Sequence, residues 1–251
     1  MAERIKRGAK LQNAQNANYS GAQELADSEN GLIQYSSEIV KKLMKFSAVA
    51  LGSSKKVLEF GAGNGFLANI WKDGQGHAPD CVEIDPTLIE MIRKRDMKCY
   101  PSLNECPGEY DVIYTSNVLE HIEDDLEALK SLCDKLIPNG ILAIYVPAFP
   151  ALFSDMDRSV GHFRRYRRKE LIEKVKMSGF QVEKCIYDDF LGFFASITVK
   201  ILGYKSSTKL GSLKTLQFYD SFIYPISRQL DALFTRKLLG KNLLLIARKL
   251  D

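Results

Sequence analysis

Short apolar runs alternate with amphipathic segments along most of the chain, a spacing typical of strands that alternate with helices. The apolar runs predict strands at 56–60, 81–85, 98–100, 111–115, 141–146, 180–187 and 242–247. Apolar residues at helical intervals predict helices over 33–50, 65–71, 86–94, 124–136 and 169–178. Because several of these strands are apolar on both faces, we expect a doubly wound α/β fold with helices on both sides of a mostly parallel sheet.

The two ends of this pattern are less regular. Residues 1–30 are rich in Ala, Asn, Gln and Lys and predict a loose or partly helical arm. A segment rich in Phe, Leu, Tyr and Lys separates the sixth strand from the last and predicts a helical insertion. We expect one domain, 1–251, divided into arm and first helix 1–50, core 55–188, insertion 189–241 and last strand 242–248. In the core, Pro138-Asn139-Gly140 is expected to end a helix before the fifth strand begins.

Composition narrows the class of protein. The chain has 251 residues, 45% of them hydrophobic and 26% charged, as is ordinary for a globular domain. Its net charge of +4 is small and its basic residues are spread along much of the chain, so no nucleic-acid partner is expected. The cysteines are odd in number and show no C-x-x-C spacing, which argues against a disulfide framework or a zinc site. They are Cys81, Cys99, Cys106, Cys133 and Cys185.

The location of the protein is expected to be cytoplasmic. Basic residues near the N-terminus have no apolar run behind them, which argues against a secretory signal. No apolar stretch reaches the roughly 18 residues that a membrane-spanning helix needs.

The most informative motif is Glu59-Phe60-Gly61-Ala62-Gly63-Asn64-Gly65, at the end of the first expected strand. Glycines at every second position let main-chain N–H groups approach a ligand closely. Phe66 stands where a dinucleotide fingerprint needs its third glycine. The Glu59 carboxylate would repel a pyrophosphate but suits an ammonium group and a sulfonium. A structural turn without a ligand is the alternative.

This motif resembles the first motif of class I S-adenosylmethionine-dependent methyltransferases. The resemblance implies S-adenosylmethionine as cofactor and a seven-stranded Rossmann-like sheet with an antiparallel last strand. The long segment 189–241 would then be an insertion between the sixth and seventh strands.

Two further sites fit the resemblance. Asp85 closes the second expected strand, where an acidic side chain can accept both ribose hydroxyls; capping the next helix is its alternative role. Glu83, two residues deeper in the strand, is interpreted as a buried structural group.

The block from Asp111 to His121 resembles the fourth motif of the branch that includes quinone-biosynthesis enzymes, where the strand end lines the methionine part of the cofactor. His121 is interpreted as packing against the structure. The predicted cofactor-binding residues are Glu59, Gly61, Ala62, Gly63, Gly65, Asp85, Pro86, Ser116, Asn117 and Val118.

The segment after the fifth strand contains the candidate acceptor site. Its core, Gly161-His162-Phe163-Arg164-Arg165-Tyr166, resembles a subset of bacterial methyltransferases. His162 is the candidate general base, since its ordinary pKa near 6.5 suits proton abstraction. Arg164, Arg165 and Tyr166 are the candidate substrate-binding residues, because guanidinium groups can hold a carboxylate or phosphate.

Two alternatives remain for this segment. Asp155 and Asp157 could instead pair with the arginines and fix the loop. These aspartates and His162 could also ligate a metal ion, but without a further ligand in the sequence no metal is expected.

Apolar and basic residues are interleaved in the insertion. It predicts a helical cap that closes the acceptor pocket, or a surface for a lipid-linked acceptor or for peripheral contact with the inner face of a membrane. A homodimer interface is a third reading. The expected reaction is methyl transfer to an oxygen of a metabolite, glycan or lipid-linked acceptor. N-methylation of a small amine and a non-catalytic S-adenosylmethionine-binding module are the alternatives.

Overall fold

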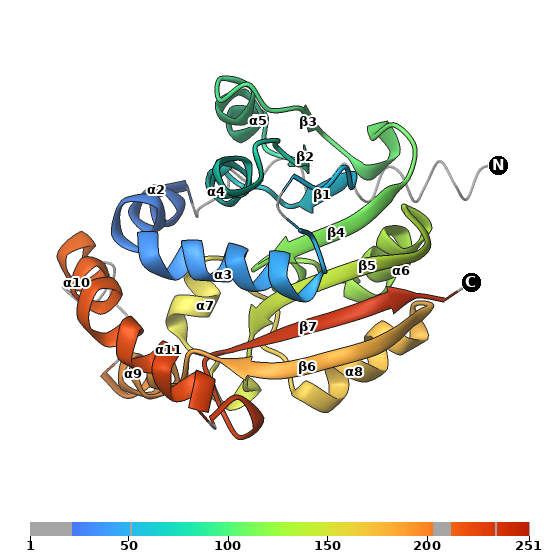
Figure 1. The fold of residues 1–251 in the computed structure, drawn as a ribbon. Coiled ribbons are helices and arrows are strands. Elements are labelled where there is room, and N and C mark those ends of the chain that lie inside the picture. The colour runs from blue at the N-terminus through green and yellow to red at the C-terminus, as the bar shows by residue number, and fades with distance from the viewer. Residues whose placement is uncertain (1–21, 51, 203–211, 234, 251) are drawn as a thin grey trace.

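The computed structural model describes residues 22–50, 52–202, 212–233 and 235–250. Seven strands form one sheet in the order β3-β2-β1-β4-β5-β7-β6 (Figure 1). They are β1 Val57–Phe60, β2 Asp80–Val82, β3 Cys99–Tyr100, β4 Tyr110–Ser116, β5 Leu136–Pro147, β6 Phe180–Asp188 and β7 Asn242–Lys249. Strands β1 to β5 pair in parallel, and β7 runs antiparallel to both β5 and β6. This confirms the predicted doubly wound sheet with its antiparallel last strand.

Helices cover both faces of the sheet. The main ones are α2 Ala22–Gly31, α3 Ile33–Phe46, α4 Phe66–Gln75, α5 Pro86–Arg93, α6 Asp125–Asp134, α7 Asp155–Ser159, α8 Arg168–Met177, α9 Phe190–Leu202, α10 Leu213–Phe218 and α11 Tyr224–Leu233. Val112 and Tyr114 of β4 pack with side chains of α3 and α4. Ile113, between them, packs on the other face with side chains of α6 and α8. The alternation of a central strand thus divides the core into two layers.

The strand order changes direction between β1 and β4. The chain runs from β1 outward to β2 and β3, and then returns to β4 on the other side of β1. In open α/β sheets, ligands bind at the carboxyl ends of the strands at such a switch point. The glycine motif follows β1, so the topology places it at this crevice.

Two sequence predictions about strands were wrong. Pro138-Asn139-Gly140 lies within β5 instead of ending a helix before it. The register shifts there, because Tyr110 pairs with Leu136 but Val112 pairs with Ile141. The strand predicted at 81–85 ends at Val82, because the Glu83 carboxylate accepts the backbone N–H groups that would continue the ladder.

The arm and the insertion pack together. Helix α2 lies within the predicted arm and contacts α3 and α10; residues 1–21 lie outside the described part. Between α10 and α11 runs a π-helical turn, η6 Tyr219–Ile223. Its Asp220 accepts the N–H groups of Gln34 and Tyr35 at 2.9 and 2.8 Å, so the insertion caps the first turn of α3.

Most of the described part of the insertion is helical, as predicted, over residues 190–202, 213–233 and 235–237. Among the described helices, none is long and apolar enough to cross a membrane.

Candidate functional site

The glycine loop is held tightly between β2 and the end of β4. Gly61, Gly63 and Gly65 all have positive φ, at 75°, 56° and 77°. The N–H groups of Gly61 and Ala62 donate to the carbonyl of Val82 at 2.9 and 3.0 Å. A Cβ at Gly61 would lie 2.4 Å from Cγ2 of Val118, so only glycine fits both the space and the backbone. Glycine therefore lets two strand ends meet here.

Glu83 is the acidic side chain that reaches this loop. One of its oxygens accepts the N–H of Gly63 at 2.8 Å. The other accepts the N–H groups of Ile84 and Asp85 at 2.8 and 3.1 Å. Burial raises the pKa of Glu83 above its ordinary value, against the lowering effect of these three bonds. A further donor would stabilise this carboxylate.

Asp85 faces the next helix instead. Its carboxylate accepts the N–H groups of Thr87 and Leu88 at 2.7 and 3.2 Å and caps α5, with Pro86 as the first helical residue. The capping role that the sequence offered as an alternative is therefore present. Ribose binding by Asp85 and cofactor contact by Pro86 stay predictions.

Glu59 lies below the loop, in the core. It is 2% exposed and accepts the Tyr114 hydroxyl hydrogen bond at 2.9 Å. Burial raises its pKa to about 8, opposed by that bond and by the backbone N–H of Ala68 in the first turn of α4. Its contact with a cofactor ammonium stays a prediction.

The end of β4 forms the opposite wall of the crevice. Asn117 adopts a positive φ of 54°, and its N–H donates to the carbonyl of Tyr145 at 2.8 Å. Ser116 accepts a hydrogen bond from the Asn117 amide at 3.4 Å. With Val118 against Gly61, these residues place the fourth motif beside the first, because β1 and β4 are neighbouring parallel strands.

Helix α2 covers the glycine loop, which the sequence did not predict. Leu25 of α2 lies 3.3 Å from the place of a Cβ on Gly63. Glu29 accepts hydrogen bonds from Asn64 at 2.7 Å and from Arg95 at 2.6 Å. The arm shows little periodicity in the sequence, which predicts a partly helical arm but gives no signal that places α2 over the loop.

On the acceptor side, Asp157 organises the loop. Burial alone would raise its pKa, but bonds from His162 and Arg165 outweigh this and hold the pKa well below its usual range. His162 Nδ1 lies 2.9 Å and Arg165 Nε 2.7 Å from the same carboxylate oxygen. Asp157 also forms a capping box with Ser154 at the start of α7. The pairing of an aspartate with an arginine, which the sequence left as an alternative, is thus observed.

The other two candidate substrate-binding residues bind Asp125. Arg164 Nη1 lies 2.9 Å from this carboxylate, and the Tyr166 hydroxyl donates to it at 2.8 Å. Arg164 also donates to the carbonyl of Glu123 at 2.7 Å. Arg165, by contrast, keeps a buried Nη1 with no hydrogen-bond partner among the described residues. Arg165 therefore keeps a buried donor group that none of these contacts uses.

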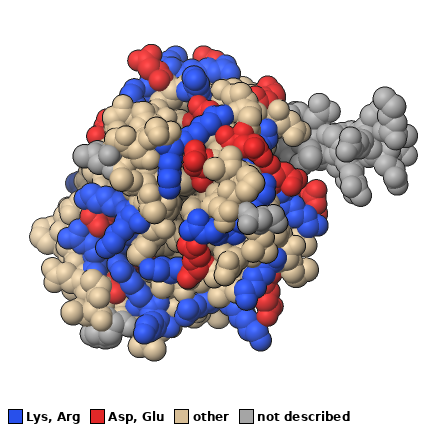
Figure 2. Space-filling view, turned by 45° about the vertical axis from the view of Figure 1, so that its right-hand side comes forward, with Lys and Arg blue, Asp and Glu red and all other residues tan. Residues whose placement is uncertain are grey.

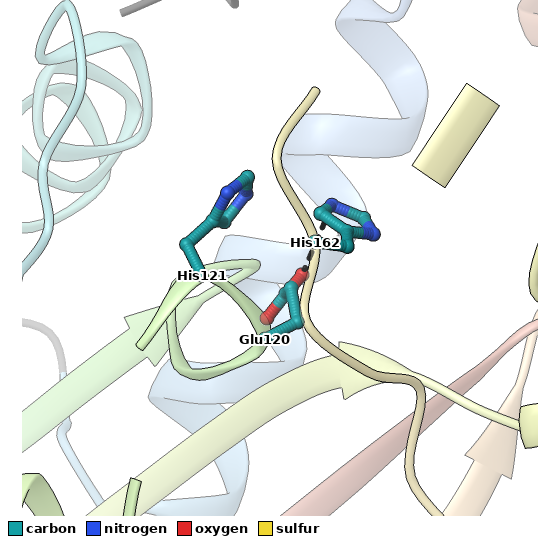
Figure 3. Close-up of side chains that lie close together, drawn as sticks. All are labelled: Glu120, His121 and His162. Atoms are coloured by element: carbon teal, nitrogen blue, oxygen red, sulfur yellow. Dashed lines mark ion pairs between the residues drawn. The ribbon is translucent and has the colours of Figure 1, made fainter. Parts of the chain in front are cut away.

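Glu120 brings a buried carboxyl group close to two histidines, and Figure 3 marks its ion pair with His162. It is fully buried, and within the described ranges neither oxygen has a hydrogen-bond partner. Burial raises its pKa to about 8. The His121 ring packs edge to face against that of His162 with centroids 4.5 Å apart, and burial lowers the pKa of His121 to about 4. The predicted packing of His121 is therefore observed, but the ring it packs on is His162.

A surface groove lies away from the glycine loop. It has a volume of about 860 Å³ and runs between Phe149, the start of α8 and Tyr187.

Comparison with known proteins then decides the family. The sequence profile of a family described as "Methyltransferase domain" matches residues 32–184, which contain both walls of the crevice. The chain belongs to this family. As a member, it is a methyltransferase domain whose cofactor is S-adenosylmethionine.

Similar proteins agree with the assignment. The mitochondrial ubiquinone biosynthesis O-methyltransferase of Schizosaccharomyces pombe is 31% identical over 105 residues, which cover 37% of this methyltransferase and 38% of the relative. The Strobilurus tenacellus methyltransferase str2 is 29% identical over 122 residues, which cover 47% of this chain and 44% of the relative. The chain thus spans less than half the length of these curated relatives.

Solved structures share the fold. A structure from Thermotoga maritima, described as a SAM-dependent methyltransferase and possible histamine N-methyltransferase, has a TM-score of 0.58 at 14% identity, covering 92% of this chain and 98% of its own. A chain from a complex between the Trm112 activator and a methyltransferase of Haloferax volcanii has a TM-score of 0.62 at 13% identity, covering 93% and 98%.

The crevice of this methyltransferase fits its cofactor. A side chain at Gly61 would clash with Val118, so only glycine lets the end of β1 and the residues after β4 approach this closely at the switch point. Glu83 offers a carboxylate beside that backbone. Small residues next to an acidic acceptor suit a nucleoside with two ribose hydroxyls.

Proposed function

We propose that this chain catalyses methyl transfer from S-adenosylmethionine to an oxygen of a metabolite, glycan or lipid-linked acceptor. The observation that carries the proposal is the glycine loop at the switch point between β1 and β4, with Val118 against Gly61. The family assignment supports the donor, and the acceptor side rests on the loop that holds His162.

Glu83 is the residue that we assign to the ribose hydroxyls, while Asp85 caps α5. The assignment is supported by the position of the Glu83 carboxylate on Gly63 and by its raised pKa, since hydroxyl donors would compensate its burial. Ser116, Asn117 and Val118 are assigned to the methionine part of the donor. We assign Glu59 a structural role beneath the glycine loop, where it accepts the backbone N–H of Ala68 in the first turn of α4.

His162 is the residue that we assign to the acceptor. Asp157 holds its Nδ1, so that Nε2 faces the buried Glu120 carboxyl at 4.0 Å. In the reaction, the acceptor oxygen attacks the methyl carbon, the carbon–sulfur bond breaks, and S-adenosylhomocysteine leaves. The acceptor hydroxyl gives up its proton to His162, the candidate general base. Much of the rate would come from alignment, which supplies up to roughly 7–11 kcal/mol in well-oriented reactions.

A lipid-linked acceptor is the substrate class that we favour. The helix from α10 to α11 exposes Phe218, Phe222 and Ile226 at intervals of four residues, with 56%, 63% and 53% of each side chain accessible. We call these three residues the apolar stripe. Exposed Lys214 and Lys237 flank it in sequence. Basic side chains are also dense over the lower left part of the face shown in Figure 2. Apolar residues accompanied by basic ones favour an anionic membrane surface.

The test is transfer of a labelled methyl group from S-adenosylmethionine into separated aqueous and lipid fractions of a cell extract. We expect label in a lipid product, with mass spectrometry placing the methyl group on oxygen. Label on nitrogen would favour the amine alternative. If the protein binds the donor but labels neither fraction, the non-catalytic module is the correct reading.

A further inference from the structure

Two segments far apart in the sequence meet beside the crevice. Glu120 and His121 form the end of the short 3₁₀ helix η3, Leu119–His121, directly after β4. His162 lies in the loop after α7. The N–H of Phe163 donates to the carbonyl of Glu120 at 2.8 Å, which ties the loop to η3. The fold therefore holds the three side chains of Figure 3 in one place by a backbone contact.

The buried carboxyl group of Glu120 lacks the hydrogen bonds that such a group usually makes. Burying a polar group without them is costly, and a native buried polar group without a hydrogen-bond partner points to an ion or other group at the site. Glu120 is 0% exposed, and both of its oxygens lack a hydrogen-bond partner among the described residues. One oxygen faces His162 Nε2 at 4.0 Å.

We propose that Glu120, His121 and His162 bind a divalent transition-metal ion. Each residue offers one ligand atom, and these atoms lie within 4.8 Å of one another. Metal–ligand distances of about 2.0–2.2 Å require a modest further approach of the side chains. Two imidazoles and one carboxylate suit Zn²⁺, Mn²⁺, Fe²⁺ or Co²⁺, whereas Mg²⁺ prefers a shell of oxygen ligands.

The surroundings of His162 support metal binding. Asp157 engages Nδ1 at 2.9 Å, which fixes the ring and directs Nε2 toward the proposed ion. Such carboxylate–histidine pairs accompany most metal-bound histidines. Asp157 is itself fixed by Arg165 at 2.7 Å. Asp157 is therefore a positioning residue for the site.

The position of the site suggests its use. Val118, which touches Gly61 of the donor loop, is two residues before Glu120 in the chain. Three protein ligands leave coordination positions for an acceptor hydroxyl, whose proton a metal ion makes easier to remove. This use rests on the proposed methyl transfer. With metal bound, the ion replaces the free imidazole as the group that activates the acceptor.

The experiment is a titration of the metal-depleted full chain with Co²⁺ and Zn²⁺, followed by calorimetry and by the visible absorption of Co²⁺. We expect one equivalent to bind, and Mg²⁺ to bind far more weakly. His162→Ala and Glu120→Gln should each weaken binding at least 10-fold, and Asp157→Asn about 10- to 100-fold. His77→Ala is the matched control, because it removes the one histidine outside the cluster.

The outcomes separate this inference from the proposed function. Glu120→Gln keeps the size of the side chain and removes its acidic group, so its metal-free form should melt no lower than the wild type, and lost binding cannot then be ascribed to unfolding. Failure of the wild type to bind Co²⁺ or Zn²⁺, or binding that survives both His162→Ala and Glu120→Gln, would overturn the metal site. Methyl transfer by a metal-free enzyme would leave the proposed function intact and return His162 to the role of base.

Discussion

At the scale of single residues, Glu83 and Asp85 illustrate what can be predicted from the sequence and what cannot. The sequence places both acids near the end of β2, and strand length then favours Asp85 for the ribose. The structure ends β2 at Val82 and turns Asp85 into the cap of α5. Since that change depends on hydrogen bonds that backbone N–H groups donate to the Glu83 carboxylate, apolar patterning gives no sign of it.

Truncation of these two acids should have different effects. Glu83→Ala is expected to weaken S-adenosylmethionine binding by about 1–3 kcal/mol, because it leaves ribose hydroxyls unpaired. Asp85→Ala should instead lower the free energy of unfolding by about 0.5–2 kcal/mol, as for other lost caps, and change the affinity little. Calorimetric titration and thermal unfolding of both variants measure these effects.

A donor analogue lacking the 2′-hydroxyl distinguishes ribose contact from a disturbed loop. It should bind the wild type more weakly than the full donor does, yet Glu83→Ala should bind both alike. If Asp85→Ala loses the preference and Glu83→Ala keeps it, the assignment is reversed.

Glu120 shows a second limit of residue patterns. A Glu before a His at the start of a helical segment is usually a solvated charge. Only the contact between η3 and the loop at Phe163 shows that this carboxyl group is buried. From the sequence, Asp155, Asp157 and His162 were considered as ligands, and no metal was expected because no further ligand was found. Glu120 and His121 of η3 could not be brought together with His162 from the sequence.

At the scale of elements, the helices were easier to predict than the turns. Pro86 at the start of α5 and Gly179 after α8 indicated helix ends that the structure places within one or two residues. Pro138-Asn139-Gly140 misled the prediction, because the residues typical of a turn occupy a register shift inside β5. Turn residues mark a change of direction but do not tell a loop from a bulge.

The apolar stripe yields the prediction at this scale. Phe218→Glu with Phe222→Glu should reduce co-sedimentation with anionic vesicles by at least 10-fold, since burying each ring contributes about 1.5–3 kcal/mol. Met177→Glu is the matched control. Met177 is 70% exposed, but it ends α8 and precedes β6, whereas the insertion begins with α9 at the opposite end of β6.

Sedimentation velocity tests whether the apolar stripe instead binds a second copy of the chain. A monomer that binds vesicles in a salt-dependent way supports the membrane surface. A dimer that the double substitution dissociates, with no vesicle binding, would assign the stripe to self-association.

At the scale of the whole molecule, the mostly parallel, doubly wound sheet follows from simple regularities. Apolar strands alternating with helices require a parallel sheet, and the glycine motif after β1 locates the switch point. The long-range packing of α2 over the loop does not follow, because it depends on contacts such as Glu29 with Asn64 and Arg95. The crevice could therefore be predicted, but its cover could not.

The central claim is that the donor binds at the glycine loop, and calorimetric titration with S-adenosylmethionine of the wild type, Gly63→Arg and Gly76→Arg tests it most directly. Gly76 also has a positive φ, of 79°, but it ends α4 with no heavy atom within 4 Å of an added Cβ, so its variant carries similar backbone strain outside the crevice. We predict one bound donor per chain for the wild type and Gly76→Arg, and no measurable binding for a folded Gly63→Arg. Equal affinity of all three proteins, or no binding by the wild type, would contradict the account.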